Sequence, residues 1–323
     1  MSKGTLLVSL DFELFWGVQD CHTYEDYGQN VIGGRAAVPQ LLDIFKKHGI
    51  HVSWATVGMM FADNKDELKK YSPQESLQPH FENKALSGYR VIDHIGDNED
   101  DEPYFYGKSL IDKIAQYPDQ EIGSHTFSHY YAREAGQTIE EFEADLKSAR
   151  KIAQDKGYDV KTLVFPRNQS KSEYEQTMLN TGFVAFRGEE EDWIHKIPVN
   201  IIKRMFRLAD SFINLTGSAT YNKSDFKKGE LYNFRGSRFL RPYSHTLRFL
   251  EGLKIRRVKG QMKKAAKKGD IFHLWWHPHN VGVDTERNLK NINEIFDYYD
   301  MLKEKYGMES KNMIELAEEI SNG

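Results

Sequence analysis

Short apolar runs alternate with helix-type patterns at the start of the chain. Residues 5–12, TLLVSLDF, form an apolar run that predicts a buried strand. Residues 35–49, RAAVPQLLDIFKKHG, then place apolar side chains at helical spacing before a terminating glycine. A second apolar run, at 50–58, follows directly. This strand, helix, strand order predicts a βα unit that feeds a parallel sheet.

The same alternation returns later in the chain. Further strands are predicted at 120–125, 160–166, 183–188 and 271–277. Helical periodicity covers residues 138–157, 171–182, 255–270, 285–307 and 310–320. In the first of these helices, Thr138 and Glu141 have the spacing of a capping box. The chain has no fixed-period repeat, which excludes solenoids and propellers.

Two segments interrupt the alternation. Residues 62–108 are polar and carry an acidic cluster, and residues 195–255 have scattered aromatics without a clear period. We therefore expect an α/β fold in a single domain over residues 1–323, with insertions at about 62–108 and 195–255.

The charge balance excludes a broad attraction to polyanions. Lys and Arg number 44 and Asp and Glu number 48, so the net charge is −4. No overall field attracts nucleic acid or an anionic membrane, and a polyanionic partner would have to be met locally. We expect no nucleic-acid partner.

The cysteine count and the N-terminal run indicate the compartment. Cys21 is the only cysteine, which excludes an intramolecular disulfide and a thiolate-rich zinc site and fits a reducing compartment. In the N-terminal run, Asp11 and Glu13 come too early for a signal peptide or a membrane span. We expect a soluble, cytoplasmic protein without stable membrane insertion, in which any metal is held by histidines and carboxylates.

Candidate catalytic side chains lie where predicted strands end. In parallel α/β folds such side chains gather on the carboxyl edge of the sheet. Asp11 and Glu13, two apart on a strand, face the same way, while Phe12 turns into the packing. Two acids on one apolar strand favour a functional pocket, the alternative being that they satisfy backbone amides or pair with a distant arginine. Other candidates at predicted strand ends are His125, His129, Arg167 and His277.

His125 and His129 lie in the stretch EIGSHTFSH. On a helix, a spacing of four puts two imidazoles on one face, where both can bind one ion. A single histidine near a strand end is more often a hydrogen-bonded core or surface residue. A pair beside a carboxylate, however, forms a ligand set that suits zinc or a related divalent ion and leaves positions for water and substrate.

Several stretches of the chain resemble conserved blocks of the polysaccharide deacetylase family, also called carbohydrate esterase family 4 or the NodB-homology domain. In chain order they are LLVSLDFELFWG, EIGSHTFSH, VFPRNQ, EEEDW and HLWWHPHN, of which the second is the most specific. The resemblance covers most of residues 4–193 and 269–280. It implies a deformed (β/α) barrel and a hydrolase that uses a divalent metal, expected to be zinc, to remove an N-acetyl or O-acetyl group from a sugar.

The resemblance also implies roles for single residues. His125 and His129 would be metal ligands, Asp11 would be the catalytic base, and Arg167 would orient Asp11. His277 would be the acid that protonates the leaving amine.

Tryptophans are the candidates for a sugar-binding wall. Asp192 and Trp193 resemble the family block that supports the catalytic histidine or forms a wall of the pocket. Trp16, Trp275 and Trp276 are candidates for a sugar platform, and core packing is an equally good interpretation for each of them.

The chain departs from the family pattern at two places. Phe12 stands where the first block normally has a second Asp, so Glu13 is the expected third ligand, reached by a bulge or by its longer side chain. In the third block, Pro166 precedes Arg167 instead of following it. If the metal site is weak, the alternative is an amidase acting on a non-sugar C–N bond, and a third alternative is a non-catalytic carbohydrate-binding protein.

The basic run at 256–268, RRVKGQMKKAAKK, has two interpretations. It is a solvated helix face, or it meets the diphosphate of a nucleotide-linked or lipid-linked sugar. Without a secretion signal, we expect an activated or lipid-linked precursor of a surface glycan as the substrate, rather than a finished wall polymer.

Overall fold

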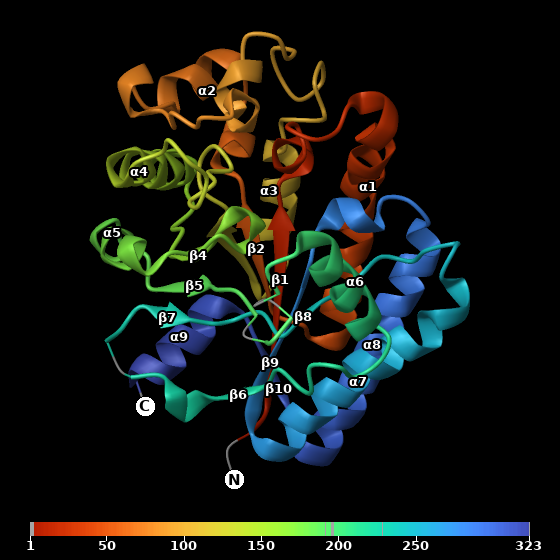
Figure 1. Cartoon of the computed structure of the whole chain (residues 1–323). Helices are drawn as coiled ribbons and strands as arrows, with labels where there is room; N and C mark the ends of the chain where they lie inside the picture. Colours follow the sequence, from red (N-terminus) through yellow and green to blue (C-terminus); the bar gives the residue numbers. More distant parts are fainter. Residues whose placement is uncertain (1–2, 191, 195–196, 228, 323) are drawn as a thin grey trace.

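Among the described residues, ten strands form one curled sheet flanked by helices (Figure 1). The computed structural model describes residues 3–190, 192–194, 197–227 and 229–322. The strand order is β6-β9-β1-β2-β3-β4-β5-β7, with β10 added to β1 and β8 to β9. The described pairs are parallel except for β6 with β9. The sheet forms a half-barrel, which confirms the deformed α/β barrel expected from the sequence.

Each strand predicted from the apolar runs is present, and further short strands come from segments that gave no strand signal. The strands are β1 (Thr5–Phe12), β2 (Val52–Thr56), β3 (Gln120–Ser124), β4 (Thr162–Val164), β5 (Ala185–Arg187), β6 (Tyr221–Asn222), β7 (Tyr232–Asn233), β8 (Arg238–Phe239), β9 (Asp270–Trp276) and β10 (Glu309–Lys311).

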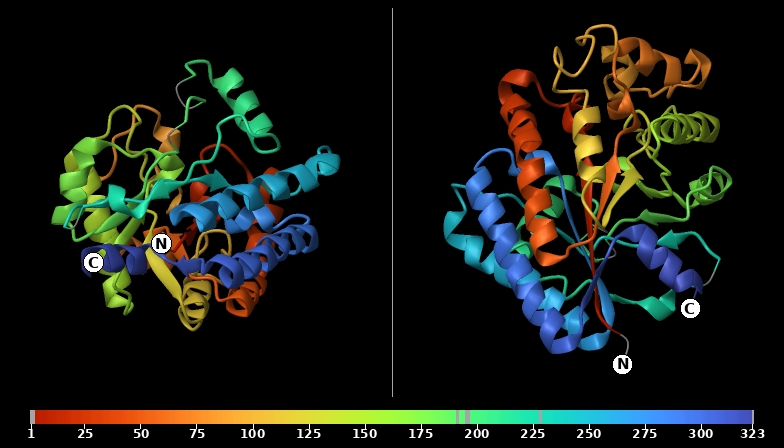
Figure 2. Two further views of the ribbon diagram at one scale, coloured as in Figure 1. Left: turned by 90° about the horizontal axis from the view of Figure 1, so that it is seen from below. Right: turned by 180° about the vertical axis from the view of Figure 1, so that it is seen from behind.

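The helices cover both faces of the sheet, with α1, α3 and α8 on the side seen from behind (Figure 2, right). Their bounds are α1 (Tyr24–His48), α2 (Lys65–Tyr71), α3 (Lys108–Ala115), α4 (Ile139–Asp155), α5 (Glu175–Asn180), α6 (Asn200–Asp210), α7 (Glu251–Lys268), α8 (Thr285–Tyr306) and α9 (Met313–Asn322). None of the helices in the described part of the chain is long and apolar enough to cross a bilayer.

Local signals in the sequence set the helix ends. Thr138 and Glu141 form the predicted capping box at the start of α4. Gly49 ends α1 with a φ of 60°, which only glycine adopts at little cost. The start of α1 lies at Tyr24, well before the predicted residue 35, because Thr23 and Asp26 form an earlier capping box.

β1 lies at the centre of the sheet, and all eight of its residues are buried. β2 and β9 pair with it on its two sides, with Asp11 opposite Ala55 and Leu10 opposite Trp276. Because these strands are parallel, their carboxyl ends meet at one edge of the sheet, which lies toward the top of Figure 1.

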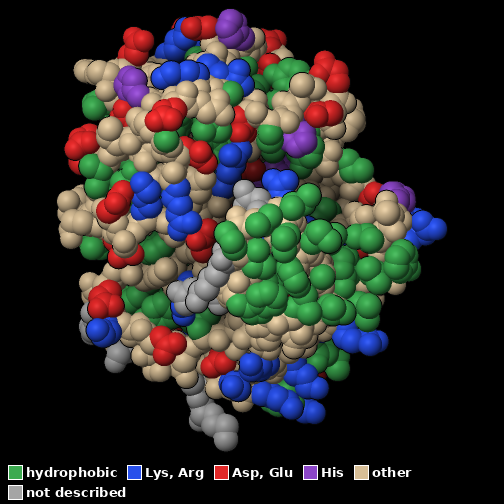
Figure 3. Space-filling model, in the orientation of Figure 1, with side chains coloured by type: hydrophobic (Ala, Val, Ile, Leu, Met, Phe, Trp, Pro, Cys, Tyr) green, Lys and Arg blue, Asp and Glu red, His purple; other side chains and the backbone are tan. Residues whose placement is uncertain are grey.

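The two segments outside the predicted alternation both reach this edge. Residues 62–108 run over it, where Phe105 packs against Trp16 with ring centroids 4.5 Å apart. Residues 195–255 contribute α6 and three short strands, of which β7 extends the sheet beside β5 and β8 pairs with β9. Figure 3 shows that the outward face of the molecule in front of this edge carries a broad hydrophobic area.

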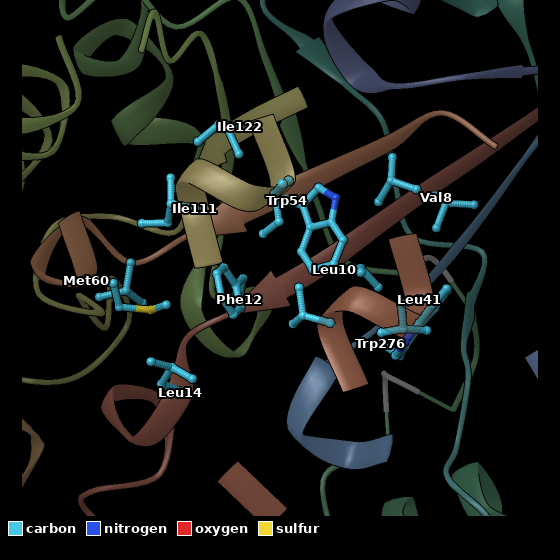
Figure 4. Packing of buried hydrophobic residues seen from close by; sticks show 14 of the residues in the cluster. Val8, Leu10, Phe12, Leu14, Leu41, Trp54, Met60, Ile111, Ile122 and Trp276 are labelled. Atoms are coloured by element: carbon cyan, nitrogen blue, oxygen red, sulfur yellow. The ribbon is translucent and has the colours of Figure 1, made fainter. Parts of the chain in front are cut away.

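The main hydrophobic core lies between β1, β2 and the helices beside them (Figure 4). Val8, Leu10 and Phe12 of β1 are at most 1% exposed, and Trp54 of β2 packs edge-on against Phe12. This packing fixes β1 in place and therefore fixes the positions of the acids at its carboxyl end.

Candidate active site

Loops at the carboxyl edge of the sheet enclose a cavity of about 380 Å³, the rim cavity. Asp11 near the end of β1 and Glu13 just beyond it both line it, as the strand alternation predicted. Phe12 between them turns into the core (Figure 4). The lining also includes His129, Arg167, Asn168, Arg207, Phe239, Trp275 and His277.

The Glu13 carboxylate lies between two pairs of imidazoles. Its Oε2 atom is 3.1 Å from Nε2 of His125 and 3.0 Å from Nε2 of His129. Its Oε1 atom is 3.7 Å from Nε2 of His277 and 3.8 Å from Nε2 of His279. The structure thus brings together Glu13, His125 and His129, the set for which the sequence predicts metal binding.

Hydrogen bonding shows that this set fits a cation. Nδ1 of His125 lies 2.8 Å from the backbone oxygen of Val164, which can only accept, so Nδ1 carries the proton. In neutral His125, Nε2 then presents a lone pair to a carboxylate oxygen of Glu13, and two such acceptors in contact need a positive charge between them. Ligand atoms 2.0–2.2 Å from a tetrahedral zinc lie roughly 3.3 Å from one another, close to the spacings found here.

Gly17 provides the space that the Glu13 side chain occupies. A Cβ atom at position 17 would lie 2.0 Å from Cδ of Glu13. The glycine therefore allows the longer glutamate side chain to fold back over the turn after β1 and reach the two histidines.

Gly17→Ala is expected to displace the Glu13 carboxylate and to lower the metal affinity of the protein by roughly tenfold or more. Gly260→Ala is the matched control, because nothing lies within 4 Å of a Cβ added at Gly260. In the middle of α7 this control should raise the free energy of unfolding by about 0.5–1 kcal/mol. Zinc titration and thermal unfolding of both variants check this, and an unchanged affinity in Gly17→Ala would contradict it.

The two histidines are held by a loop, so the interpretation that they share a helical face is wrong. Thr126 and His129 have φ angles of 64° and 57°, in the left-handed region. The rings of His125 and His129 nevertheless lie 5.0 Å apart. Their convergence comes from this strained loop and not from helical periodicity.

Asp145 on α4 holds the loop in shape. Its carboxylate accepts hydrogen bonds from the backbone N–H groups of Phe127 and Ser128, at 2.6 and 3.1 Å, and from the Ser128 hydroxyl. Asp145 is fully buried, and burial raises its pKa to about 6. The sequence pattern did not identify this residue, because an acid on a helix normally faces solvent.

Asp145→Ala is expected to lower the free energy of unfolding by about 2–4 kcal/mol, since it leaves two buried N–H groups unpaired. The same change should reduce metal binding, because the loop carries His129. Glu143→Ala, which removes the surface pair of Glu143 with Lys147 on the same helix, is the control and should change stability by under about 0.5 kcal/mol. Urea unfolding measures the free energy of unfolding of both variants, and equal values would contradict the role of Asp145 in holding the loop.

Arg187 at the end of β5 forms a bidentate ion pair with Asp11. Its two terminal nitrogens lie 2.6 and 2.7 Å from the two oxygens of the Asp11 carboxylate. Asn168 accepts two further hydrogen bonds from the guanidinium group, which stacks 4.2 Å from the Trp275 ring. Ser9 accepts another, at 2.9 Å. Arg187 is wholly buried, so this bidentate ion pair fixes Asp11 in one orientation.

The expectation that Arg167 orients Asp11 is therefore corrected. Arg167 forms an ion pair with Asp20 and lies 4.3 Å from the Tyr131 ring, still on the lining of the rim cavity. Its φ is 53°, in the short 3-10 turn that begins at Pro166. The signal for Arg187 was present in FVAFRG, where a cation ends an apolar strand.

Ion pairs keep both acids of the rim cavity charged. Burial by itself raises the pKa of Asp11, but Arg187 and the nearby imidazoles lower it below its ordinary value. For Glu13, burial again acts to raise the pKa, and the surrounding histidines hold it well below the usual range. Burial lowers the pKa of His129.

Three further histidines lie on or just after β9. His277 places Nε2 3.5 Å from Asp11 at the mouth of the rim cavity, and its Nδ1 lies 3.1 Å from the side-chain oxygen of Asn280. His273 is buried deeper, between Ser9 and the backbone oxygen of Phe234, and burial lowers its pKa to about 3. Burial also lowers the pKa of His279 to about 3.

Of the four tryptophans predicted to bind the sugar, Trp275 is the one that lies on the lining of the rim cavity. It donates a hydrogen bond to Glu190 at 3.2 Å. Trp16 and Trp276 are 1% and 0% exposed and belong to the core, so a sugar-binding role for them is wrong. Figure 4 shows Trp276 among the buried hydrophobic residues. Trp193 is 46% exposed, packs against Phe206 of α6 and is not part of the lining.

Fold and site together define an α/β enzyme of the hydrolase class. A family model described as polysaccharide deacetylase matches residues 22–186, just over half of the chain. The chain belongs to the polysaccharide deacetylase family and is a hydrolase that acts on C–N bonds other than peptide bonds. The matched range contains His125 and His129 but ends one residue before Arg187, and it includes neither Asp11 nor Glu13.

Solved structures share the fold at low identity. A protein from Mycobacterium smegmatis that is described as a polysaccharide deacetylase has a TM-score of 0.62 and 12% identity, over 99% of this chain and 91% of that one. A second, from Pseudomonas aeruginosa PAO1, has a TM-score of 0.55 and 10% identity, over 98% and 90%. Puue allantoinase has a TM-score of 0.56 and 11% identity, over 98% and 90%. No curated protein matches the chain.

Proposed function

We propose that the chain is a metal-dependent deacetylase that removes the acetyl group from an N-acetylated or O-acetylated sugar. The observation that carries this proposal is the contact of Glu13 Oε2 with Nε2 of both His125 and His129, at 3.1 and 3.0 Å. These residues would hold the ion, for which the nitrogen and oxygen ligands favour zinc. When bound, such an ion lowers the pKa of a water molecule and polarises an amide carbonyl.

The other residues of the rim cavity supply proton transfer and positioning. Asp11, kept ionised by Arg187, is the base that takes a proton from the attacking water. His277, with Nε2 3.5 Å from Asp11, lies at the mouth and delivers a proton to the leaving amine. Trp275 offers an aromatic wall for the sugar ring, and Phe239 of β8 lies next to it with ring centroids 4.7 Å apart.

The substrate that we favour is an activated or lipid-linked precursor of a surface glycan. A cytoplasmic location is part of the proposal, and the free, exposed thiol of Cys21 fits a reducing compartment. The two alternatives make different predictions: an amidase acting on a non-sugar C–N bond would purify with little metal, and a binding protein would keep its sugar affinity without turnover.

A screen for released acetate tests the proposal. Free, nucleotide-linked and lipid-linked acetamido sugars are incubated with zinc-loaded wild type and with His125→Ala in parallel. We expect acetate from at least one class with wild type and roughly a hundredfold less or none with the variant. Equal release by His125→Ala, or no release by a fully metallated wild type, would reject a metal-dependent deacetylase.

A further inference from the structure

Helix α6 presents its apolar side to solvent. Its sequence, NIIKRMFRLAD, places apolar and basic residues on two separate sides of the helix. The apolar side is open: Ile201 and Met205 are 69% and 66% exposed, and Ile202, Phe206 and Leu208 are also exposed. A surface helix of a globular protein normally buries its apolar stripe against the core. In α6 the apolar stripe faces solvent instead, so it does not pack against the rest of the protein.

The basic side of α6 faces inward instead. Lys203 and Arg207 are only partly exposed, and Arg207 lines the rim cavity. At the end of the helix, Asp210 is buried and pairs with Arg238 at 2.5 Å and with Arg257 at 3.2 Å. These buried ion pairs fix the orientation of α6, so the exposure of its apolar side is built into the fold.

Neighbouring residues extend this surface. Trp193 packs edge-on against Phe206 with ring centroids 5.3 Å apart, and Val199 and Ile213 flank the helix. Seen from below, α6 projects from the front of the molecule, and Figure 3 shows a broad hydrophobic area there (Figure 2, left). We define the α6 patch as Trp193, Val199, Ile201, Ile202, Met205, Phe206, Leu208 and Ile213, all of them exposed.

The surroundings of the α6 patch are strongly basic. Residues 232–268 carry twelve Lys and Arg, all but Arg238, Lys254 and Arg257 reaching the surface, against one acid, Glu251, although the whole chain has a net charge of −4. α6 itself adds one exposed cation, Arg204. Blue side chains lie around the hydrophobic area in Figure 3. An apolar surface with a basic border complements an anionic lipid surface, into which apolar side chains insert while cations meet the headgroups.

We propose that the α6 patch docks the chain onto an anionic membrane surface, with the rim cavity opening beside the lipid headgroups. Arg207 belongs both to α6 and to the lining of the rim cavity, so docking through α6 brings the cavity to the membrane. A second copy of the chain fits less well, since a two-fold contact would place basic borders against each other. This inference goes beyond the proposed deacetylation and does not depend on it.

Cosedimentation with lipid vesicles tests the proposal. Wild type is mixed with vesicles of phosphatidylglycerol and phosphatidylcholine, or of phosphatidylcholine alone. We expect binding to the anionic vesicles that weakens as salt is raised, with a blue shift of the tryptophan fluorescence, because Trp193 is the exposed tryptophan among the described residues. The double variant Ile201→Glu/Met205→Glu should bind roughly tenfold more weakly or worse.

Met301→Glu is the matched control, because Met301 is 61% exposed on α8, outside the α6 patch. It should bind like wild type, and thermal unfolding should show that all variants are folded. The proposal is overturned if wild type does not cosediment with the anionic vesicles, or if the double variant binds them as well as wild type does. A wild-type dimer that the double substitution dissociates also overturns it, because the patch would then be covered by a second copy. None of these readouts needs turnover, so a failure of the deacetylase proposal would be seen separately.

Discussion

Glu13→Gln is expected to abolish tight metal binding and to reduce deacetylation by roughly three orders of magnitude or more. The amide keeps the shape of the carboxylate but is a poor ligand, so His125 and His129 would be left without the charged member of their set. The metal-free variant should fold at least as well as metal-free wild type. Its amide N–H can donate to the Nε2 lone pairs of the histidines, and one buried charge is lost.

Thermal unfolding with and without zinc separates these effects. Zinc should raise the Tm of wild type, because it binds only the folded chain, and should leave the Tm of Glu13→Gln nearly unchanged. Elemental analysis should find far less zinc in the variant. A variant that retains a full equivalent of zinc and its activity would show that Glu13 is not a ligand.

Arg187→Met is expected to lower kcat by roughly a hundredfold or more, since Asp11 loses the group that orients it. It should also lower the free energy of unfolding by about 3–5 kcal/mol, because the Asp11 carboxylate remains buried without its partner. Arg167→Met is the matched control: it removes a partly exposed cation that pairs with Asp20, and its effect on kcat should be far smaller.

Adding Asp11→Asn to Arg187→Met distinguishes positioning from folding. The double variant should recover most of the lost stability, since no charge stays unpaired, while remaining inactive. If Arg167→Met is the more damaging of the two arginine substitutions, Arg167 and not Arg187 acts on Asp11.

Much of the fold could be read from local patterns. Apolar runs predicted β1, β2, β3, β4, β5 and β9, because strands buried on both faces leave a strong signal. The alternation along β1 also predicted that Asp11 and Glu13 share a cavity while Phe12 is buried. Placing strand ends on one edge predicted that the two histidines meet a carboxylate of the first strand, and the family resemblance pointed to Glu13. A loop and not a helix brings the two histidines together.

The parts that the sequence did not predict depend on contacts between distant segments. Arg187 meets Asp11 only because β5 and β1 end at the same edge, and the family resemblance pointed to Arg167 instead. The buried position of Asp145 depends on the loop after β3, whose backbone N–H groups donate to its carboxylate, and a helical pattern does not report such a contact. The space that Gly17 leaves for Glu13 becomes visible only with coordinates.

Residues 195–255 illustrate a different difficulty. Their short strands β6, β7 and β8 have two residues each, too few for a periodic signal. α6 does have a clear apolar side, but that side faces solvent, so its pattern does not report packing in the core.

An anomalous-difference map at the zinc absorption edge, from crystals of wild type grown with zinc, shows whether Glu13, His125 and His129 bind one metal ion. We expect one strong peak bonded to Nε2 of His125, Nε2 of His129 and an oxygen of Glu13. Two results would contradict zinc binding at this site. One is the absence of a peak there in crystals grown with excess zinc, and the other is a peak bonded to His277 and His279 but not to His125 and His129.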